Sequence, residues 1–404
     1  MTKVARNHVT DLRGASRVLV DAIAGITRLV EAMHANIAKT PTRLAGAFVG
    51  GAVNGATAVV YSSIRGIVRA VGAGVDLALG AGAPGLGHIE SAAACESAIA
   101  ALNGVLGDYL AETANPLAVT MHLRRDGKPL ELTREGLAAQ IQVPSSKVLV
   151  LVHGLCRNDR GWQRDGHDHG AELARDLAYT AAYLQYNTGL HVSTNGRAFA
   201  QTLEELVASW PVPLKEVSIL AHSMGGLVAR SAYHYASVAG HAWPRKLRKL
   251  VFLGTPHHGA PLERAGHWFN LLLEATPYTA PFALLGKIRS AGITDLRHGY
   301  VLEEDWKGYD RFADRCESCR TLPLPKRVKC YTIAATIGHA RSPCRDQLIG
   351  DGLVPVASAL GEHRDSRRRL GFSRARQWTA TGTSHVGLLR SGQVYERIRC
   401  WFGE

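Results

Sequence analysis

A serine in the segment Leu220–Gly226, Leu-Ala-His-Ser-Met-Gly-Gly, has the surroundings of a nucleophile. Ser223 follows the apolar run Glu216–Leu220 and precedes a helix-compatible stretch that begins at Gly226. A serine on a sharp turn between a buried strand and a helix presents its hydroxyl for attack, and small neighbours let the helix begin close to the strand. The residue types alone also fit a serine that caps a helix, so the other motifs have to decide between the two interpretations.

A serine hydroxyl is a weak nucleophile at neutral pH, and it needs a base that a third group orients. Asp351 lies between two glycines, after a predicted strand at 327–335. His385 follows a predicted strand that begins at Gln377. With these residues, His385 would take the proton of Ser223 and later protonate the leaving group, while Asp351 would hold the imidazole in the required tautomer.

Other carboxylates and histidines compete for these roles. Asp346 precedes Asp351 by five residues, and Asp365 lies beyond it. Asp351 is preferred because it follows the predicted strand after a short loop. The chain has 18 histidines, and His385 is the one shortly after the last predicted strand.

A strand at Lys147–Val152 is predicted to carry half of an oxyanion hole. Its continuous apolar run is typical of a central parallel strand, and it ends in His153-Gly154. Backbone N–H groups stabilise the negative oxygen that forms during acyl transfer, one from the residue after the nucleophile and one from a loop after an early strand. The sequence therefore predicts that Leu155 and Met224 donate these two N–H groups.

In combination, these motifs resemble those of the α/β-hydrolase superfamily and, within it, the lipase and PGAP-type serine esterase group. The resemblance covers about the last two thirds of the chain and rests on five segments: Val152–Leu155, Ala221–Gly226, Gly254–Gly259, Asp351–Pro355 and Ser384–Leu388. Ala221 stands where the usual motif has its first glycine. The resemblance implies an α/β fold with a mostly parallel central sheet flanked by helices.

The same resemblance implies an activity. The expected enzyme cleaves carboxylic esters, with lipid or acyl esters as substrates, through an acyl-enzyme on Ser223, without a cofactor or a metal. An acyltransferase or a thioesterase would use the same three residues. An inactive hydrolase fold that serves as a membrane scaffold is a further alternative, and the presence of all three residues argues against it.

The first part of the chain differs in character from the rest. Apolar residues at helical spacing predict three amphipathic helices, over 12–37, 53–75 and 92–110. We therefore expect an N-terminal helical region at 1–112 and a catalytic domain at 113–404. The uncharged stretch Leu44–Ile64 is long enough to cross a bilayer, but its glycines and polar residues favour a buried hairpin or a helix lying on a membrane.

Two features are predicted inside the catalytic domain. Residues 117–132, with Asp126-Gly127 at their centre, predict a hairpin with a tight turn. Residues 260–325 form a long insertion that is rich in aromatic and leucine residues. The insertion could be a lid over an acyl pocket or a set of ordinary packing helices.

The net charge and the cysteines limit which binding partners and which cellular compartment we expect. The net charge is +13, with a dense basic run at Arg364–Arg376, which fits a solvated loop or a contact with anionic lipid. No nucleic-acid recognition motif accompanies it.

The segment 1–14 is polar rather than leader-like, which predicts a cytoplasmic protein with reduced thiols that could be peripheral to a membrane. Cys316 and Cys319, with Cys330 and Cys344, could bind zinc, but the later pair is widely spaced, so we expect no metal.

Overall fold

The computed structural model describes residues 92–260, 290–309, 321–338 and 350–404. The chain divides into two compact units, of which one comprises Ser91–Tyr109 with Val119–Glu404 and the other Met1–Glu90 with Leu110–Ala118. The two helices predicted before residue 91, and the stretch Leu44–Ile64, lie outside the described residues. Among the helices that are described, none has the length and apolar character needed to cross a bilayer.

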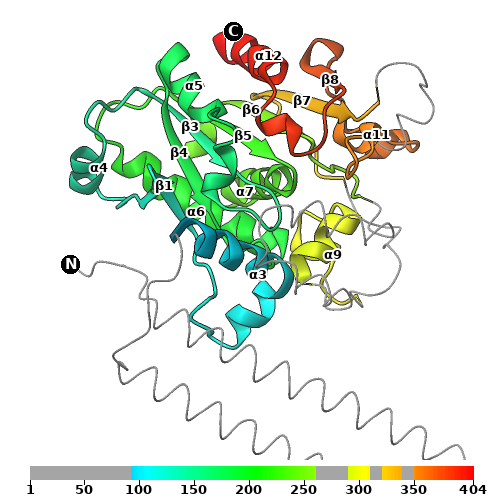
Figure 1. The fold of residues 1–404 in the computed structure, drawn as a ribbon, viewed down its shortest axis with the longest axis horizontal. Helices are drawn as coiled ribbons and strands as arrows, with labels where there is room; N and C mark the ends of the chain where they lie inside the picture. Colours follow the sequence, from blue (N-terminus) through cyan, green and yellow to red (C-terminus); the bar gives the residue numbers. More distant parts are fainter. Residues whose placement is uncertain (1–91, 261–289, 310–320, 339–349) are drawn as a thin grey trace, which may run out of the picture. The chain divides into compact units, whose positions relative to one another are not determined.

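The described part of the unit that contains Val119–Glu404 is built on an eight-stranded sheet (Figure 1). In sequence order the strands are β1 (His122–Arg125), β2 (Lys128–Pro129), β3 (Lys147–Val152), β4 (Thr180–Gln185), β5 (Glu216–His222), β6 (Leu247–Leu253), β7 (Lys329–Thr336) and β8 (Gln377–Thr381). Their spatial order is β2-β1-β4-β3-β5-β6-β7-β8, with β1 antiparallel to both of its neighbours and β4 to β8 parallel with β3. This arrangement is the α/β-hydrolase fold, and the predicted fold class is confirmed.

The hairpin at the edge of the sheet is confirmed as well. Asp126 and Gly127 both have positive φ, 50° and 72°, as a two-residue turn of this type requires. β1 and β2 pair across that turn in antiparallel register. Between β3 and β5 in the chain lies β4, a strand that the sequence analysis did not predict.

Helices cover the sheet. The described helices are α3 (Ala92–Glu112), α4 (Arg134–Gln140), α5 (His169–Leu177), α6 (Val192–Ser209), α7 (Met224–Ala239), α9 (Ala291–His298), α11 (Val356–Ala359) and α12 (Gly392–Gly403). Short 3₁₀ turns occur at Asp159–Trp162, Trp243–Arg245, Glu303–Asp305, Ser366–Arg368, Arg374–Arg376 and Gly387–Leu389.

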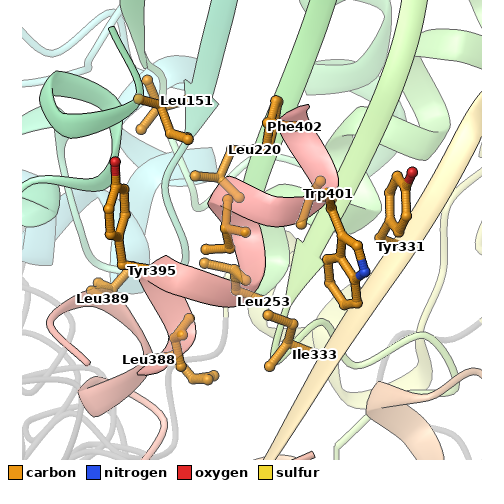
Figure 2. Close-up of a cluster of buried hydrophobic side chains, with 14 of the residues drawn as sticks. Leu151, Leu220, Leu253, Tyr331, Ile333, Leu388, Leu389, Tyr395, Trp401 and Phe402 are labelled. Atoms are coloured by element: carbon orange, nitrogen blue, oxygen red, sulfur yellow. The ribbon is translucent and has the colours of Figure 1, made fainter. Parts of the chain in front are cut away.

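One face of the sheet is sealed by α5 and α12. Figure 2 shows α12 with Trp401 beside Tyr331 of β7, and the two rings stack with centroids 4.8 Å apart. Leu151, Leu220 and Leu253, from three adjacent strands, are fully buried in the same cluster. Burial of each such side chain stabilises the fold by about 1.5–3 kcal/mol. This cluster holds the central strands rigidly, so the loops at their ends are well positioned.

The opposite face is covered by α7, which packs closely against the strands. A Cβ on Gly226 would lie 2.8 Å from the ring of Phe252. Phe252 alternates with Val251 and Leu253 along β6, so it points to the other side of the sheet. Since both faces are covered, most residues of the central strands are apolar, as expected for parallel strands.

Helix α3 is confirmed where its apolar spacing predicted it, and it packs on the loops that follow β3 and β4. Cβ atoms added to Gly104 and Gly107 would lie 2.2 Å from Cys156 Sγ and 1.9 Å from Asn187 Oδ1. Ser290, the N-cap of α9, donates its hydroxyl to the carbonyl of Gly104 at 2.7 Å. Residues 91–109 therefore belong with the sheet-containing unit, ahead of the expected domain boundary at 112/113.

Only part of the predicted insertion at 260–325 is described. It contains α9 and a 3₁₀ turn, and Val301 N and Leu302 N both donate to Asp305 Oδ2 at 2.9 Å. The segments 261–289 and 310–320 lie outside the described residues. The role of the insertion as a lid stays a prediction.

Candidate active site

Ser223 occupies the turn between β5, which ends at His222, and α7, which begins at Met224. Its backbone has φ 54° and ψ −127°, a conformation that non-glycine residues rarely adopt and that costs about 1–3 kcal/mol. The turn is held by the Ser223 N–H, which donates to the carbonyl of Leu253 at 2.8 Å. A Cβ on Gly225 would lie 2.5 Å from the carbonyl oxygen of Val152, so only glycine lets α7 begin this close to β3.

His385 and Asp351 form a buried pair. His385 Nδ1 lies 2.7 Å from Asp351 Oδ2, and their side chains are 3% and 0% exposed. Asp351 Oδ1 accepts the backbone N–H groups of Leu353 and Val354 at 2.9 and 2.8 Å, which fixes the carboxylate. His385 Nε2 has no hydrogen-bond partner among the described residues. A histidine that donates from Nδ1 to a carboxylate leaves Nε2 as the nitrogen that can accept a proton.

Contacts at the ends of β5 and β6 place this pair next to the serine turn. His222 Nε2 donates to the carbonyl of His385 at 3.1 Å, and the two rings are 4.7 Å apart. Gly254 follows β6 with φ 56°, and a Cβ there would lie 3.0 Å from Asp351 Oδ2 and 3.1 Å from His385 Nδ1. The structure therefore brings the predicted residues Ser223, Asp351 and His385 to one edge of the sheet.

The loop after β3 adjoins the same turn. A Cβ on Gly154 would lie 2.9 Å from the Cβ of Ser223. On either side of Leu155 the loop is fixed, because Tyr186 donates its hydroxyl to the His153 carbonyl at 2.7 Å and Cys156 N donates to Thr188 Oγ1 at 3.1 Å. As the first residue of α7, Met224 has an N–H without an acceptor inside the helix. The two amides predicted for an oxyanion hole thus belong to segments that meet at Ser223.

The sequence analysis did not identify the residues that fix this loop. Tyr186 stacks on the ring of His153 with centroids 4.5 Å apart, in addition to its hydrogen bond. Tyr186 and Thr188 follow β4, the strand that was not predicted. The signal that could have found them is the run Tyr183–Tyr186, whose aromatic and apolar residues are compatible with a strand.

Burial keeps the neighbouring histidines neutral. It lowers the pKa of His153 to about 4 and the pKa of His222 well below the usual 6.5. For His222, the nearby His385 lowers the pKa further. At neutral pH both residues therefore act as hydrogen-bonding and packing groups.

The cysteines considered for a zinc site lie only partly within the described residues. Within those ranges no three His, Cys, Asp or Glu side chains are grouped so that they could hold a metal ion. Of the four cysteines considered for zinc, Cys330 is buried with a free thiol. Cys316, Cys319 and Cys344 lie outside the described residues, so the expected absence of a metal stays a prediction.

Comparison with protein families gives one match, to a domain of unknown function (DUF7379) over residues 115–297. None of the curated protein sequences matches the chain. Among solved structures, the chain is similar to the mature lipase BlEst2 of Bacillus licheniformis, with 20% identity over 65% of this chain and 95% of that one and a TM-score of 0.42.

Two other solved structures show comparable similarity. Phospholipase PlaB of Legionella pneumophila is 15% identical over 64% of this chain and 60% of its own, with a TM-score of 0.43. Lipase B of Aspergillus fumigatus is 12% identical over 72% of this chain and 57% of its own, with a TM-score of 0.40.

Proposed function

We propose that the protein is a serine hydrolase that cleaves carboxylic esters, with Ser223 as nucleophile, His385 as general base and acid, and Asp351 as the group that orients the histidine. The observation that carries the proposal is the buried His385–Asp351 pair, 2.7 Å between Nδ1 and Oδ2, beside a serine held at positive φ on a strand–helix turn. Triads of this kind are recognised by the geometry and the roles of their residues, and the pair supplies the oriented base that the proposed role of His385 requires.

The proposed reaction has two halves. Ser223 Oγ attacks the ester carbonyl carbon while His385 Nε2 takes the hydroxyl proton, and the N–H groups of Leu155 and Met224 donate to the resulting oxyanion. His385 then protonates the departing alcohol, which leaves an acyl group on Ser223. A water molecule, deprotonated by His385, attacks the acyl-enzyme and releases the carboxylic acid and the free serine.

Lipid or acyl esters are the proposed substrate class. Support comes from the motifs shared with the lipase and PGAP-type esterase group, which are the strand end with His153-Gly154, the Ser223 turn and the loop Gly254–Gly259. The fold alone does not select a substrate. The acyl chain length therefore has to be measured.

A fluorophosphonate probe and a chain-length series of p-nitrophenyl esters test the proposal together. We expect the wild-type chain to be labelled and to hydrolyse at least one ester of the series, whereas Ser223→Ala, folded by circular dichroism, is neither labelled nor active. Labelling that persists in a folded Ser223→Ala variant would falsify the assignment of the nucleophile. A wild-type chain that is labelled but transfers acyl groups to alcohols faster than to water would make it an acyltransferase.

A further inference from the structure

A cavity of about 380 Å³ lies along the second half of α7, apart from the candidate active site. Its walls are Arg230, Tyr233, His234 and Ser237 of α7 and the segment 322–327 that leads into β7. Arg230 follows Ser223 by seven residues, which is about 10 Å along a helix axis. Helix α7 runs from the serine turn, at the carboxyl ends of the strands, back toward their amino ends. Residues 322–327 lead into the amino end of β7. The cavity therefore lies toward the edge of the sheet opposite the serine turn. Its volume is in the range of small-molecule sites, about 300–1,000 Å³.

Arg230 is a buried cation that makes no direct ion pair with a described carboxylate, although the nearby Asp305 acts against the lowering of its pKa by burial. It is 3% exposed, and no carboxylate of the described residues lies within ion-pair distance of it. Its Nη2 donates to the Leu322 carbonyl at 2.6 Å and its Nη1 to His257 Nδ1 at 3.4 Å, while its Nε has no partner among the described residues. Burial lowers the pKa of Arg230 only to about 10, so the guanidinium stays charged at neutral pH. A buried charge of this kind is costly unless a partner compensates it.

The other side chains at the cavity add positive charge and hydrogen-bond donors. Lys326 and Arg327 line it and are exposed, and His234 lines it from α7. The hydroxyl of Tyr233 can donate as well, whereas the hydroxyl of Ser237 donates to the Tyr233 carbonyl at 2.7 Å. Among the described residues that line the cavity, none is an aspartate or a glutamate. A guanidinium offers a fork of donors that matches the oxygens of a phosphate, and several cations favour a doubly charged group over a single carboxylate.

We propose that this cavity binds a phosphate group, carried either by a small soluble molecule or by a lipid headgroup. Leu322, Pro323, Leu324 and Pro325 supply an apolar wall beside the cations, which suits a phosphate that bears an organic substituent. The site is separate from Ser223, and it does not depend on the proposed hydrolase activity.

Calorimetric titration of the full-length chain with inorganic phosphate tests the soluble source. The decisive variant is Lys326→Gln with Arg327→Gln, because both side chains are exposed and their loss should leave the fold intact. Arg230→Gln removes the buried cation, and circular dichroism reports whether that variant folds. Arg248→Gln is the matched control, since Arg248 is an exposed arginine of β6 outside the cavity. We expect saturable binding that the cavity variants weaken roughly tenfold or more, as the loss of charge-assisted hydrogen bonds implies.

Co-sedimentation with phosphatidylcholine vesicles, with and without one fifth phosphatidic acid, tests the lipid source. Vesicle binding that needs phosphatidic acid and is weaker in the double variant than in Arg248→Gln, without binding of free phosphate, supports the site and assigns the headgroup as its ligand. If neither probe binds the wild-type chain, or if the double variant binds both as tightly as Arg248→Gln does, the proposal is overturned. The double variant decides the matter if Arg230→Gln does not fold.

Discussion

At the scale of single residues, three hydrogen bonds hold the carboxylate of Asp351 in its position. One oxygen accepts two backbone N–H groups and the other accepts His385 Nδ1. The backbone adds a further link, because His385 N donates to the Asp351 carbonyl at 3.0 Å. The position of the side chain therefore does not depend on its charge alone, whereas the tautomer of His385 does depend on an acceptor at Oδ2.

We predict that Asp351→Asn lowers ester turnover by roughly four orders of magnitude while the fold persists. The amide can keep the position of the carboxylate, but an NH₂ group at Oδ2 cannot accept from Nδ1, so His385 would hold its proton on the wrong nitrogen. Steady-state kinetics with a p-nitrophenyl ester measures the effect. Asp365→Asn is the control, because Asp365 pairs with Arg367 at the surface, where solvent screens an ion pair and its loss changes stability little. Equal losses in both variants would mean that Asp351 has no special role.

The central residues of the candidate site could be predicted from sequence, and the residues that support them could not. Ser223 follows the mostly apolar strand β5 and His385 follows β8, which begins at the predicted Gln377, so their place at one sheet edge follows from the rules for parallel sheets. Tyr186 and Thr188 fix the loop near Leu155 through contacts with residues about thirty positions away. Such contacts depend on which strands become neighbours, and no local pattern encodes that.

At the scale of elements, β3 was predicted from its long apolar run, and the hairpin of β1 and β2 was predicted from its Asp-Gly turn. β3 matches its predicted bounds, β8 begins at the predicted Gln377, and β7 extends one residue beyond the predicted 327–335. β4 was missed because Thr180–Gln185 contains two alanines and ends in a polar residue, so its composition is weakly strand-like. Its burial comes from its neighbours, β1 and β3, and this tertiary context outweighs propensity.

Helix α3 was predicted as part of an N-terminal region, and its contact with the loop after β3 was not. The spacing of the glycines in that helix gives no signal in the sequence. Gly104 nevertheless lets Cys156 pack closely against the helix, because glycine has no Cβ. Cys156 itself has φ 58° and follows Leu155, whose N–H is proposed for the oxyanion hole. The helix therefore supports the loop directly, and a change in α3 should be detected at the active site.

We predict that Gly104→Ala lowers both the thermal midpoint of unfolding and the ester turnover. The added Cβ would lie 2.2 Å from Cys156 Sγ, so the loop must shift, at a cost of about 1–3 kcal/mol that outweighs the roughly 1 kcal/mol gained from better helix propensity. Differential scanning fluorimetry and ester kinetics measure the two effects.

Gly392→Ala is the control for Gly104→Ala, because a Cβ at this helical position of α12 meets nothing within 4 Å. Adding Cys156→Ala to the Gly104→Ala variant should restore part of the turnover, since it removes the sulfur that is contacted. A Gly104→Ala variant that is stabilised and fully active would show that the helix and the loop are not coupled.

At the scale of the whole molecule, buried neutral histidines should make stability depend on pH. Burial lowers the pKa of His153 and of His169 from 6.5 to about 4. The unfolded chain therefore binds more protons than the folded chain between pH 6.5 and 4, and the free energy of unfolding falls as the pH falls through that window. Buried carboxylates with raised pKa values, such as Asp295, act in the opposite direction as the pH falls from the raised pKa toward the usual 3.8. The effect of the histidines is clearest in the upper part of the window.

Urea unfolding at pH 7 and at pH 5 measures this difference. We expect a lower free energy of unfolding at pH 5. The difference should be smaller in His169→Asn, because this variant removes one of the two buried imidazoles, which contacts Leu388 and Tyr395. Equal stability at the two pH values would mean that these histidines can be protonated in the folded chain.

The last prediction concerns residues 1–90, which belong to a different compact unit from the sheet. We propose that residues 1–90 attach the protein peripherally to anionic membranes, because their apolar residues recur at helical spacing and the whole chain carries a net charge of +13. Removal of residues 1–90 should leave a folded enzyme that cleaves water-soluble esters and has lost most of its binding to anionic vesicles at low salt.

Removal of residues 1–109 should instead unfold or inactivate the protein, because it deletes the contacts of Gly104 and Gly107 with Cys156 and Asn187 and the acceptor for Ser290. Circular dichroism, ester kinetics and vesicle co-sedimentation separate the two truncations. If the shorter truncation binds vesicles as well as the full chain does, the first 90 residues do not provide the attachment. If the longer truncation remains folded and active, α3 is dispensable and the catalytic domain begins near residue 113, where its sequence motifs start.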